Sequence, residues 1–465
     1  MPRVVVVGAG VSGLSAAYRL RERRPDIDVV VLEASDRAGG LLRTERGGGC
    51  LVERGPESFI TTKTAALELI EKLGMQDQLI RTEKAHQGAY VVHAGRLERI
   101  PAGFSVLGPG RIRPLLRSPL LSWRGKARAL VEPLIPRARG QEDESLGSFV
   151  ERRYGREMLD RLAQPLAGGI YGADPFELSL RSTMPRFLDL EERFGSVTVG
   201  LRRGDSQSAG AAGARYGLFV TLRDGMESLS RALVEALPGG VRLNEPVKAL
   251  ARVSEGWRVC TDDAEIDADA VIIATPASVA GHLLREVSPE AARGLSQVHL
   301  GSAAAVTMAF KTSDLPRPLD AFGFVVPARE DHPVMAATFS SVKWQGRAPE
   351  GISLIRVFLG GAHLPEVPGW SDEALERSAR DGLRRWLRIG VRPETVWLDR
   401  WHSVMPRYRL GHAARTRQLR GQLRETSGLA LCGTAFDGVG VPDAVRTGGE
   451  AAERVLVEMK GRARN

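Results

Sequence analysis

The sequence predicts an α/β fold whose main domain is a doubly wound parallel sheet, joined to a mixed-sheet domain and a helical insert. Three observations predict it. A β-branched apolar run, Pro2–Val7, leads through a glycine-rich turn into a helical stretch, 14–24. A second apolar run, 28–32, follows that helix. Further apolar runs at 269–275 and 429–432 return late in the chain, as expected when one sheet is assembled from distant segments.

The glycine-rich turn predicts a dinucleotide-binding loop. Gly8 makes the tight turn, Gly10 lets the backbone approach a pyrophosphate, and Gly13 lets the helix pack closely on the strand. Ser12 belongs to the same loop, and the helix that follows points its free N–H groups at the phosphates. Glu33 ends the second strand, where its carboxylate can accept hydrogen bonds from ribose hydroxyls.

A second glycine loop narrows the nucleotide. Arg37, Gly39 and Gly40 follow the second strand, and this run resembles the Arg-x-Gly-Gly element of flavin enzymes of the glutathione-reductase-like class. A nicotinamide dehydrogenase does not need this loop, so the resemblance implies FAD. A strand expected at 241–250 would lie at the adenine end, with Val247 among the cofactor contacts.

The C-terminal segment predicts a second helix N-terminus beside the flavin. A short strand ends at Gly433, a glycine-rich loop follows, and Pro442 suits the first turn of a helix at 444–459. The positive end of that helix would stabilise the negative charge of a reduced flavin. The cofactor residues expected in this segment are Gly433, Val439, Gly440 and Val441.

The segment order predicts a chain of 465 residues folded in three parts. The expected parts are a discontinuous FAD-binding domain (1–85, 218–255 and 425–465), a helical insert (86–217) and a substrate-binding domain (256–424).

Local patterns refine this division. Residues 141–162 are expected to be helical with Ser145 as N-cap, and the glycine-rich run 164–174 is expected to interrupt the helix. The composition of 204–217 predicts a flexible loop, 252–266 a hairpin, and 302–361 a mixed or antiparallel sheet.

Composition favours an enzyme from a reducing compartment. The three cysteines, Cys50, Cys260 and Cys432, lie far apart and form no CxxC pair. This spacing argues against a disulfide framework or a zinc site, so a cytoplasmic location and no metal are expected. The sequence contains no run of about 18 apolar residues that would span a bilayer.

The net charge of +9 is concentrated in residues 96–139, where ten lysines and arginines oppose Glu98 and Glu132. Leucines and Trp123 are interleaved with these charges. Three interpretations stay open: a solvated helical face, a peripheral contact with anionic lipid on the inner face of the cell membrane, or an electrostatic funnel for a polyanionic substrate. No nucleic-acid partner is expected, because no nucleic-acid-binding module accompanies the segment.

Several motifs resemble the oxygen-dependent porphyrinogen oxidase family of haem biosynthesis, and the resemblance runs nearly end to end. They are Glu53–Phe59, Pro165–Tyr171 with Leu178–Ser179, Gly323–Phe324, His402–His412 and Gly433–Asp443. General flavin amine oxidases share only the first and last elements of the chain. The resemblance implies an FAD enzyme that removes six electrons from coproporphyrinogen III or protoporphyrinogen IX, with dioxygen as acceptor and hydrogen peroxide as product.

The resemblance also implies which residues meet the ligands. The cofactor residues expected in the middle of the chain are Gly55, Pro56, Glu57 and Ser58, near the reacting face, and Trp401. Gly168 and Gly169 are expected to turn a backbone carbonyl toward the pyrrole N–H groups. Apolar walls are expected at Val325, Thr338 and Phe358, with ordinary core packing as the alternative. We assign no catalytic residue, and we expect structural roles for His402 and His412, with a general base as the alternative.

Two features bear on the substrate. Mitochondrial and plastid-type relatives have an arginine for a propionate where this sequence has Ala89. At Lys63 and Lys343 the sequence resembles the Gram-positive-type enzymes, which use coproporphyrinogen III. Coproporphyrinogen III has four propionates, so more cationic partners are expected for it. We therefore expect coproporphyrinogen III, with protoporphyrinogen IX as the alternative.

Two other classes of function stay open. One is a different flavin oxidase, such as an amine oxidase or a carotenoid desaturase. An amine oxidase usually frames its substrate nitrogen with an aromatic pair, for which only Trp401 and Tyr408 are candidates. The other is a non-catalytic flavin-binding partner of haem-pathway enzymes. A homodimer is also left open.

Overall fold

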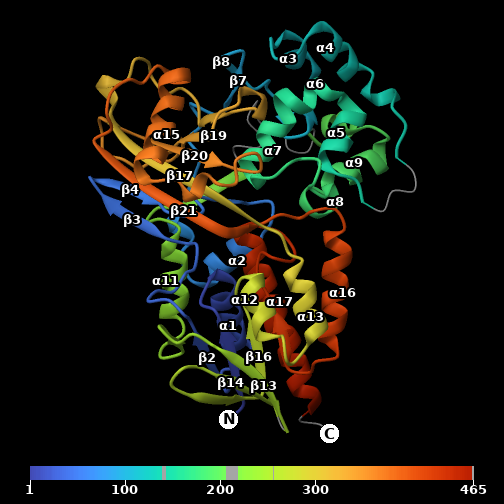
Figure 1. The fold of residues 1–465 in the computed structure, drawn as a ribbon, viewed down its shortest axis with the longest axis vertical. Coiled ribbons are helices and arrows are strands. Elements are labelled where there is room, and N and C mark those ends of the chain that lie inside the picture. The colour runs from blue at the N-terminus through green and yellow to red at the C-terminus, as the bar shows by residue number, and fades with distance from the viewer. Residues whose placement is uncertain (139–142, 206–217, 255, 463–465) are drawn as a thin grey trace.

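The computed structural model describes residues 1–138, 143–205, 218–254 and 256–462. Figure 1 shows an elongated molecule with two levels. The lower level contains the parallel sheet with α1 (Val11–Arg23) and α17 (Val441–Arg462), and the upper level contains a second sheet beside a group of short helices. Among the described residues, no helix is long and apolar enough to cross a membrane.

The lower level is built on a five-stranded sheet, and every neighbouring pair in it is parallel. Its strands, in order across the sheet, are β12 (Val241–Arg242), β2 (Asp28–Leu32), β1 (Arg3–Val7), β16 (Ala270–Ile273) and β22 (Leu429–Leu431). The valine-rich strands follow from burial on both faces. The predicted doubly wound sheet, assembled from distant segments, is confirmed.

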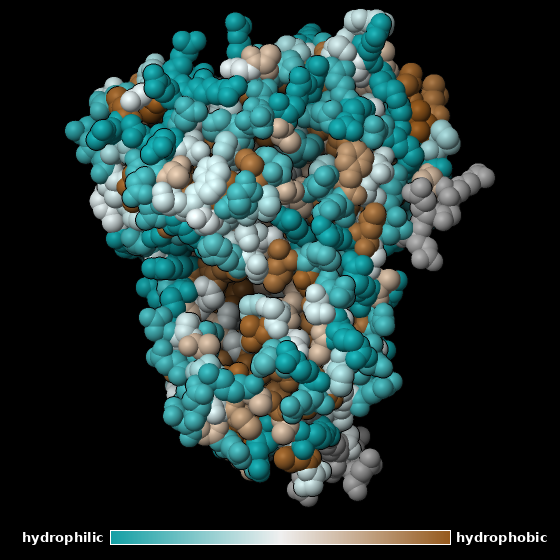
Figure 2. Space-filling view, in the orientation of Figure 1, coloured by the Kyte–Doolittle hydropathy of each residue, from teal (hydrophilic) through white to brown (hydrophobic). Residues whose placement is uncertain are grey.

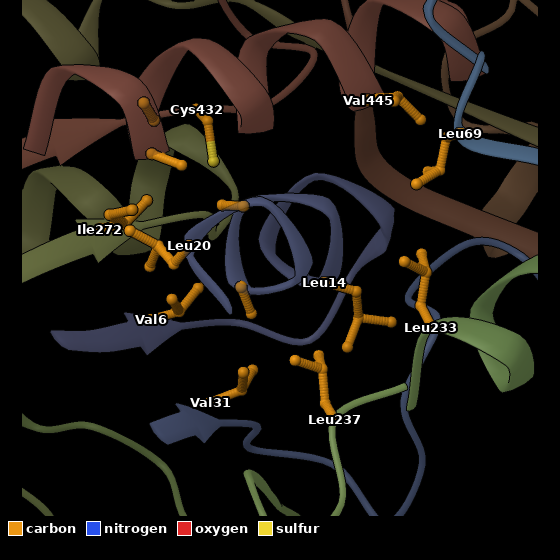
Figure 3. Close-up of a cluster of buried hydrophobic side chains, with 14 of the residues drawn as sticks. Val6, Leu14, Leu20, Val31, Leu69, Leu233, Leu237, Ile272, Cys432 and Val445 are labelled. Atoms are coloured by element: carbon orange, nitrogen blue, oxygen red, sulfur yellow. The ribbon is translucent and has the colours of Figure 1, made fainter. Parts of the chain in front are cut away.

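The alternation of β1 divides its side chains between two cores. Val4 and Val6 pack with α1 and α17, together with α2 (Ala65–Lys72) and α11 (Glu227–Glu235), and Figure 3 shows Val6 and Leu14 within this cluster. Val5 and Val7 face the other core. The elements of that second core are β13 (Ala249–Val253), β14 (Gly256–Cys260), β15 (Glu265–Ala268), α12 (Ala277–Leu283), α13 (Pro289–Ser296) and α16 (His412–Arg424).

The upper level contains a seven-stranded mixed sheet, in which only β18 and β7 pair in parallel. Its strands, in order, are β21 (Thr395–Pro406), β17 (Leu300–Lys311), β20 (Ile352–Gly360), β19 (Val334–Phe339), β18 (Gly323–Val325), β7 (Tyr90–His93) and β8 (Arg96–Arg99). Helix α15 (Asp372–Leu387), capped by Ser371, covers one face through Leu383 and Trp386. The opposite face of the seven-stranded sheet is not covered by α15 and is called the open face below.

A group of helices stands beside this sheet (Figure 1). Its members are α3 (Ile112–Arg117), α4 (Trp123–Leu130), α5 (Leu146–Tyr154), α6 (Arg156–Met158), α7 (Gln164–Tyr171), α8 (Leu180–Thr183), α9 (Arg186–Phe194) and α10 (Val197–Asp205). Ser145 caps α5 as predicted, because its Oγ accepts a hydrogen bond from the Ser148 N–H at 3.0 Å. The fully buried Arg153 of α5 pairs with the equally buried Glu132.

Smaller strand pairs connect the two levels. They are the hairpin β3 (Thr44–Gly47) with β4 (Cys50–Glu53), the sheet of β5 (Phe59–Ile60), β11 (Phe219–Leu222) and β6 (Leu79–Arg81), and the pair β9 (Phe104–Ser105) with β10 (Gly108–Pro109).

Three of the predicted domain boundaries separate elements that pair or pack together in the structure. Strands β7 and β8 fall within the predicted insert, 86–217, yet they form the edge of the seven-stranded sheet. The predicted boundary at 255 separates β13 from β14, yet these strands pair, and β16 joins the parallel sheet. Helix α16 falls within the predicted substrate domain but packs in the second core of the lower level. A sequence pattern predicts a strand, whereas its partner depends on tertiary packing.

Three local predictions also change. The run 164–174 does not interrupt the helical pattern, since Gln164–Tyr171 forms α7 despite its two glycines. The strand predicted at 241–250 is confined to Val241–Arg242. The flexible loop predicted at 204–217 begins inside α10, and its residues 206–217 lie outside the described part of the chain.

Candidate active site

The first glycine loop leaves open space where a phosphate group would approach. Gly8 has a φ of +102°, and a Cβ on Gly13 would lie 2.0 Å from the Gly8 carbonyl oxygen, so only glycine fits there. A Cβ on Gly10 would meet no atom within 4 Å. Beside this loop, the buried hydroxyl of Thr275 has no hydrogen-bond partner among the described residues, and the Thr275 methyl carbon would lie 3.4 Å from a Cβ on Gly8. This open cradle with an unpaired hydroxyl fits a dinucleotide.

The second glycine loop lies against the first. A Cβ on Gly40 would come within 3.2 Å of the Gly10 Cα, and Gly39 forms a β-bridge with Gly10. Arg37 holds the second loop by donating hydrogen bonds to the backbone carbonyls of Gly40 (2.7 Å) and Leu42 (2.5 Å). The two loops therefore form one surface.

Glu33 links this surface to the end of β2. Its carboxylate accepts hydrogen bonds from the N–H groups of Ala9 (2.8 Å) and Ser35 (3.0 Å). The Glu245 N–H donates to the Glu33 carbonyl at 2.9 Å, and Val247, two residues further on, packs partly buried on the second core. Val247 thus lies near the carboxyl end of β2, on the side predicted for the adenine.

The first turn of α1 packs against Gly448, in the N-terminal half of α17. A Cβ on Gly448 would lie 2.2 Å from the Ser12 carbonyl oxygen, and a Cβ on Gly433 would be 4.0 Å from the Ser12 hydroxyl. The buried Asp443 in the first turn of α17 accepts a hydrogen bond from Gly440 N–H at 3.4 Å and from Lys63 Nζ at 2.7 Å. Two helix N-termini therefore converge on one region, which favours an anionic ligand.

The remaining C-terminal loop residues connect the two levels. Val441 is buried in the core with α1, whereas Val439 packs against the helical group that contains α7. His412 is buried, stacks on Tyr408 with ring centroids 4.0 Å apart, and contacts the Phe436 carbonyl oxygen at 2.8 Å. His402 is exposed. His412 therefore has structural contacts that hold the C-terminal loop.

Residues 54–58 form a loop that docks on the open face of the seven-stranded sheet. Arg356 Nη1 donates to the Gly55 carbonyl at 2.8 Å, and Arg54 Nε donates to Asp399 at 2.6 Å. A Cβ on Gly55 would lie 1.8 Å from the Leu41 carbonyl oxygen, so this position requires glycine. Pro56 and Ser58 are half-buried.

Glu57 of the same loop forms a buried ion pair with Lys343. Lys343 Nζ lies 3.1 Å from Glu57 Oε2, and the Ser340 hydroxyl donates to Oε1 at 2.6 Å. Burial opposes the charge of Glu57, but Lys343, Ser340 and Arg356 outweigh it and lower the pKa of Glu57 to about 2. In contrast, burial raises the pKa of the neighbouring Glu53 to about 7. Lys343 is thus occupied by a protein carboxylate.

The predicted wall residues share one face of the seven-stranded sheet. Val325 pairs with Ala336, Ala336 pairs with Phe358, and Thr338 lies two residues from Ala336. Paired residues share a face, and so do residues two apart in a strand. Trp401 is on the same face, and the Arg356 guanidinium lies 5.1 Å from the Phe358 ring centroid and 5.4 Å from that of Trp401. The structure therefore brings these predicted residues together.

Helix α7 lies against this face. A Cβ on Gly169 would be 3.6 Å from Val325 and 3.9 Å from Ala336. The Gly168 carbonyl, predicted to face a ligand, instead accepts the Gly172 N–H at 2.8 Å within the helix end. The glycines continue the helix, and the predicted contact of a backbone carbonyl in this segment with a ligand stays a prediction.

A cavity of about 520 Å³ lies beside α7, in the size range of small-molecule sites. Gly168 and Gly169 form part of one wall, and Val326 and Met335 part of another. Figure 2 also shows a hollow with apolar residues between the two levels of the molecule. The charged residues that line the cavity are Arg156, Asp160, Asp174, Glu177, Arg329, Arg407 and Arg409.

Sequence reasoning missed four residues of this region. Arg356 is a single charge within the apolar strand 352–360, an anomaly that could have been noticed. Thr275 follows a buried parallel strand, and Asp443 lies in the first turn of a helix, and both are places where ligand contacts gather. Arg407 lies inside the 402–412 motif, but the resemblance implied no separate role for it.

Comparison with known proteins agrees with this geometry. The model of the flavin containing amine oxidoreductase family matches residues 11–456. The chain is 32% identical to the coproporphyrinogen III oxidase of Bacillus subtilis over 97% of each chain. It is 35% identical to that of Propionibacterium freudenreichii, over 97% of this chain and 90% of the relative. It is 32% identical to the protoporphyrinogen oxidase of Homo sapiens, over 97% and 98% of the two chains.

Solved structures share the fold. The crystal structure named "Putative protoporphyrinogen oxidase from Exiguobacterium sp. 255-15" superposes with a TM-score of 0.87 at 30% identity, covering 99% of each chain. Reduced UDP-galactopyranose mutase superposes with a TM-score of 0.74 at 17% identity, covering 98% of this chain and 96% of that one, which shows the fold alone. The cofactor is FAD, which the two glycine loops and the paired helix N-termini fit. The chain belongs to the flavin-containing amine oxidoreductase family.

Proposed function

We propose that this protein is an FAD-dependent porphyrinogen oxidase of haem biosynthesis that converts coproporphyrinogen III to the porphyrin, with dioxygen as acceptor and hydrogen peroxide as product. The observation that carries the proposal is the end-to-end similarity to relatives named coproporphyrinogen III oxidase and protoporphyrinogen oxidase. When bound, the flavin supplies a two-electron acceptor that dioxygen re-oxidises, so that three rounds remove the six electrons.

The residues of the chain position the reactants. Both glycine loops and the N-termini of α1 and α17 hold the dinucleotide, and Arg356 fixes the 54–58 loop through the Gly55 carbonyl. Val325 and Phe358 supply an apolar surface on the open face of the seven-stranded sheet, which excludes water from the reacting ring. No proton-transfer residue is assigned.

The charge of the cavity favours an acidic substrate over an amine. Four arginines and three carboxylates line it, whereas an amine oxidase must accommodate a cationic substrate. The structure gives no support to Lys63 and Lys343 as propionate partners, because they pair with Asp443 and Glu57. The preference for coproporphyrinogen III, with four propionates rather than two, therefore rests on Arg329 and Arg407, the cavity arginines that form no ion pair with a described residue.

A direct rate comparison tests the proposal. Anaerobically prepared coproporphyrinogen III and protoporphyrinogen IX are mixed with FAD-loaded protein in air, and porphyrin fluorescence is followed. Faster oxidation of coproporphyrinogen III supports the proposal. Faster oxidation of protoporphyrinogen IX keeps the enzyme class and changes the substrate. Oxidation of neither above the uncatalysed rate, with FAD bound, contradicts the proposal.

We also propose that the helical group makes a peripheral contact with an anionic membrane surface. Trp123 and Leu134 are 73% and 81% exposed, and the partly exposed Leu116 and Leu130 lie in the same segment. This exposed apolar surface lies within the basic segment 96–138 of the described chain, a combination that binds anionic lipid. Co-sedimentation with vesicles containing phosphatidylglycerol, lost in the Trp123→Ser/Leu134→Ser variant, is expected; equal sedimentation of both proteins contradicts it.

A further inference from the structure

Two guanidinium groups in the lining of the cavity beside α7, those of Arg329 and Arg407, form no ion pair with a described residue, and Arg407 is the less exposed of the two. Arg409 binds Glu177 through contacts of 2.7 and 2.8 Å, and Arg156 binds Asp160 at 2.8 Å. Arg407 lines the same cavity and forms no ion pair with any described residue. A partly buried cation without a carboxylate is costly unless a ligand compensates it.

The side chain of Arg407 is held in place by backbone rather than by acid. Its Nη2 donates to the Gly172 carbonyl at 3.1 Å, at the negative end of α7. Its Nε is buried without a partner and would lie 2.6 Å from a Cβ on Gly301, so the glycine provides the room for the guanidinium. Its Nη1 makes no hydrogen bond to a described residue. Burial lowers the pKa of Arg407, as expected for a desolvated cation.

The same segment connects the cavity to the cofactor loop. Arg407 and Arg409 line the cavity, while Tyr408 between them donates its hydroxyl to the Thr434 carbonyl at 2.6 Å, in the loop that begins at Gly433. The Arg407 side chain therefore lines the cavity, while the side chain of its neighbour Tyr408 holds the cofactor loop. An anion bound by Arg407 would therefore be linked to the cofactor loop through Arg407 and its neighbour Tyr408.

We propose that Arg407 binds a carboxylate of the substrate, a propionate side chain of the porphyrinogen, and thereby sets the orientation of the ring in the cavity. This inference rests on the proposed function. Arg407 is pre-positioned by Gly172 and Gly301, so little side-chain entropy is lost when the carboxylate binds. The charge-assisted hydrogen bond explains why the cavity keeps a guanidinium without an acidic partner.

Binding of the stable product tests the assignment without turnover. Coproporphyrin III and its tetramethyl ester are titrated into FAD-loaded wild type, Arg407→Gln, Arg407→Lys and the control Arg417→Gln. Arg417 is exposed on α16, so its replacement by glutamine removes the same charge at a position away from the cavity. We expect Arg407→Gln to weaken coproporphyrin III binding about 10- to 100-fold, with partial recovery in Arg407→Lys. The ester should bind wild type and variant alike, and Arg417→Gln should match wild type.

Kinetics separate this inference from the proposed function. Each variant is first checked for FAD content and melting temperature, then assayed with both porphyrinogens. A KM raised only for coproporphyrinogen III assigns Arg407 to a propionate that protoporphyrinogen IX lacks. A KM raised for both substrates assigns Arg407 to a propionate that they share. Either result supports the inference. Unchanged affinity and KM in a folded, FAD-loaded Arg407→Gln overturns it and keeps the function. Wild type that oxidises neither porphyrinogen overturns both.

Discussion

Replacing Lys343 by methionine should destabilise the protein rather than weaken substrate binding. Lys343 and Glu57 have side chains that are only 15% and 12% exposed, and their charged atoms lie 3.1 Å apart. The pKa of Glu57 falls from 4.5 to about 2, and each unit is worth about 1.4 kcal/mol. After the opposing effect of burial, the net shift corresponds to about 3 kcal/mol at neutral pH, and Lys343 is the largest of the groups that lower the pKa.

The sign of the pH dependence follows from the same shift. Because the folded-state pKa of Glu57 lies below the unfolded value, its contribution is complete above pH 4.5 and is lost as the pH falls toward 2. We expect Lys343→Met to lower the free energy of unfolding by about 3 kcal/mol at pH 7, and the difference from wild type to narrow below pH 4.5.

Urea unfolding with saturating FAD, followed by tryptophan fluorescence at pH 7 and at pH 4, measures this difference. The Glu57→Gln/Lys343→Met double variant is the matched control, because it removes both charges and should be more stable than Lys343→Met alone. The reasoning fails if Lys343→Met is as stable as wild type at pH 7 and raises the KM for coproporphyrinogen III. That result would restore the substrate contact expected from the sequence.

Two further predictions concern the cofactor loops and a buried acid. Gly13→Ala should abolish FAD binding and destabilise the apoprotein, since the new Cβ would meet the Gly8 carbonyl oxygen at 2.0 Å. Gly10→Ala should weaken FAD binding without changing the stability of the apoprotein. Flavin absorbance and apoprotein melting distinguish the two, and equal melting of both variants would contradict the expectation. Because burial raises the pKa of Glu53 from 4.5 to about 7, stability should fall by about 3 kcal/mol between these pH values. Glu53→Gln should remove that fall, and an unchanged pH profile would refute it.

The dinucleotide loops could be predicted from the sequence because their determinants are local. Gly8 has a positive φ of +102°, and a Cβ on Gly13 would meet the Gly8 carbonyl oxygen within the same loop. The second glycine loop could be placed against the first because both follow neighbouring parallel strands. The predicted wall residues Val325 and Phe358 also lie on one face, as the strand period requires.

The partners of the charged side chains could not be predicted in this way. Lys343 and Lys63 resemble substrate cations in sequence, yet they meet Glu57 and Asp443, which are far away along the chain. The two glycines of α7 indicated a break, but packing against Val325 sustains the helix there. Propensity and composition describe single segments, whereas these contacts depend on how distant segments meet.

Peroxide stoichiometry tests the central claim most directly. FAD-loaded protein is mixed with coproporphyrinogen III in air, and hydrogen peroxide and coproporphyrin III are both quantified. Removal of six electrons, two per dioxygen, predicts about three peroxides for each porphyrin. Bound flavin that coproporphyrinogen III does not reduce under anaerobic conditions, or porphyrin formed without peroxide, would contradict the assignment of this chain as a porphyrinogen oxidase.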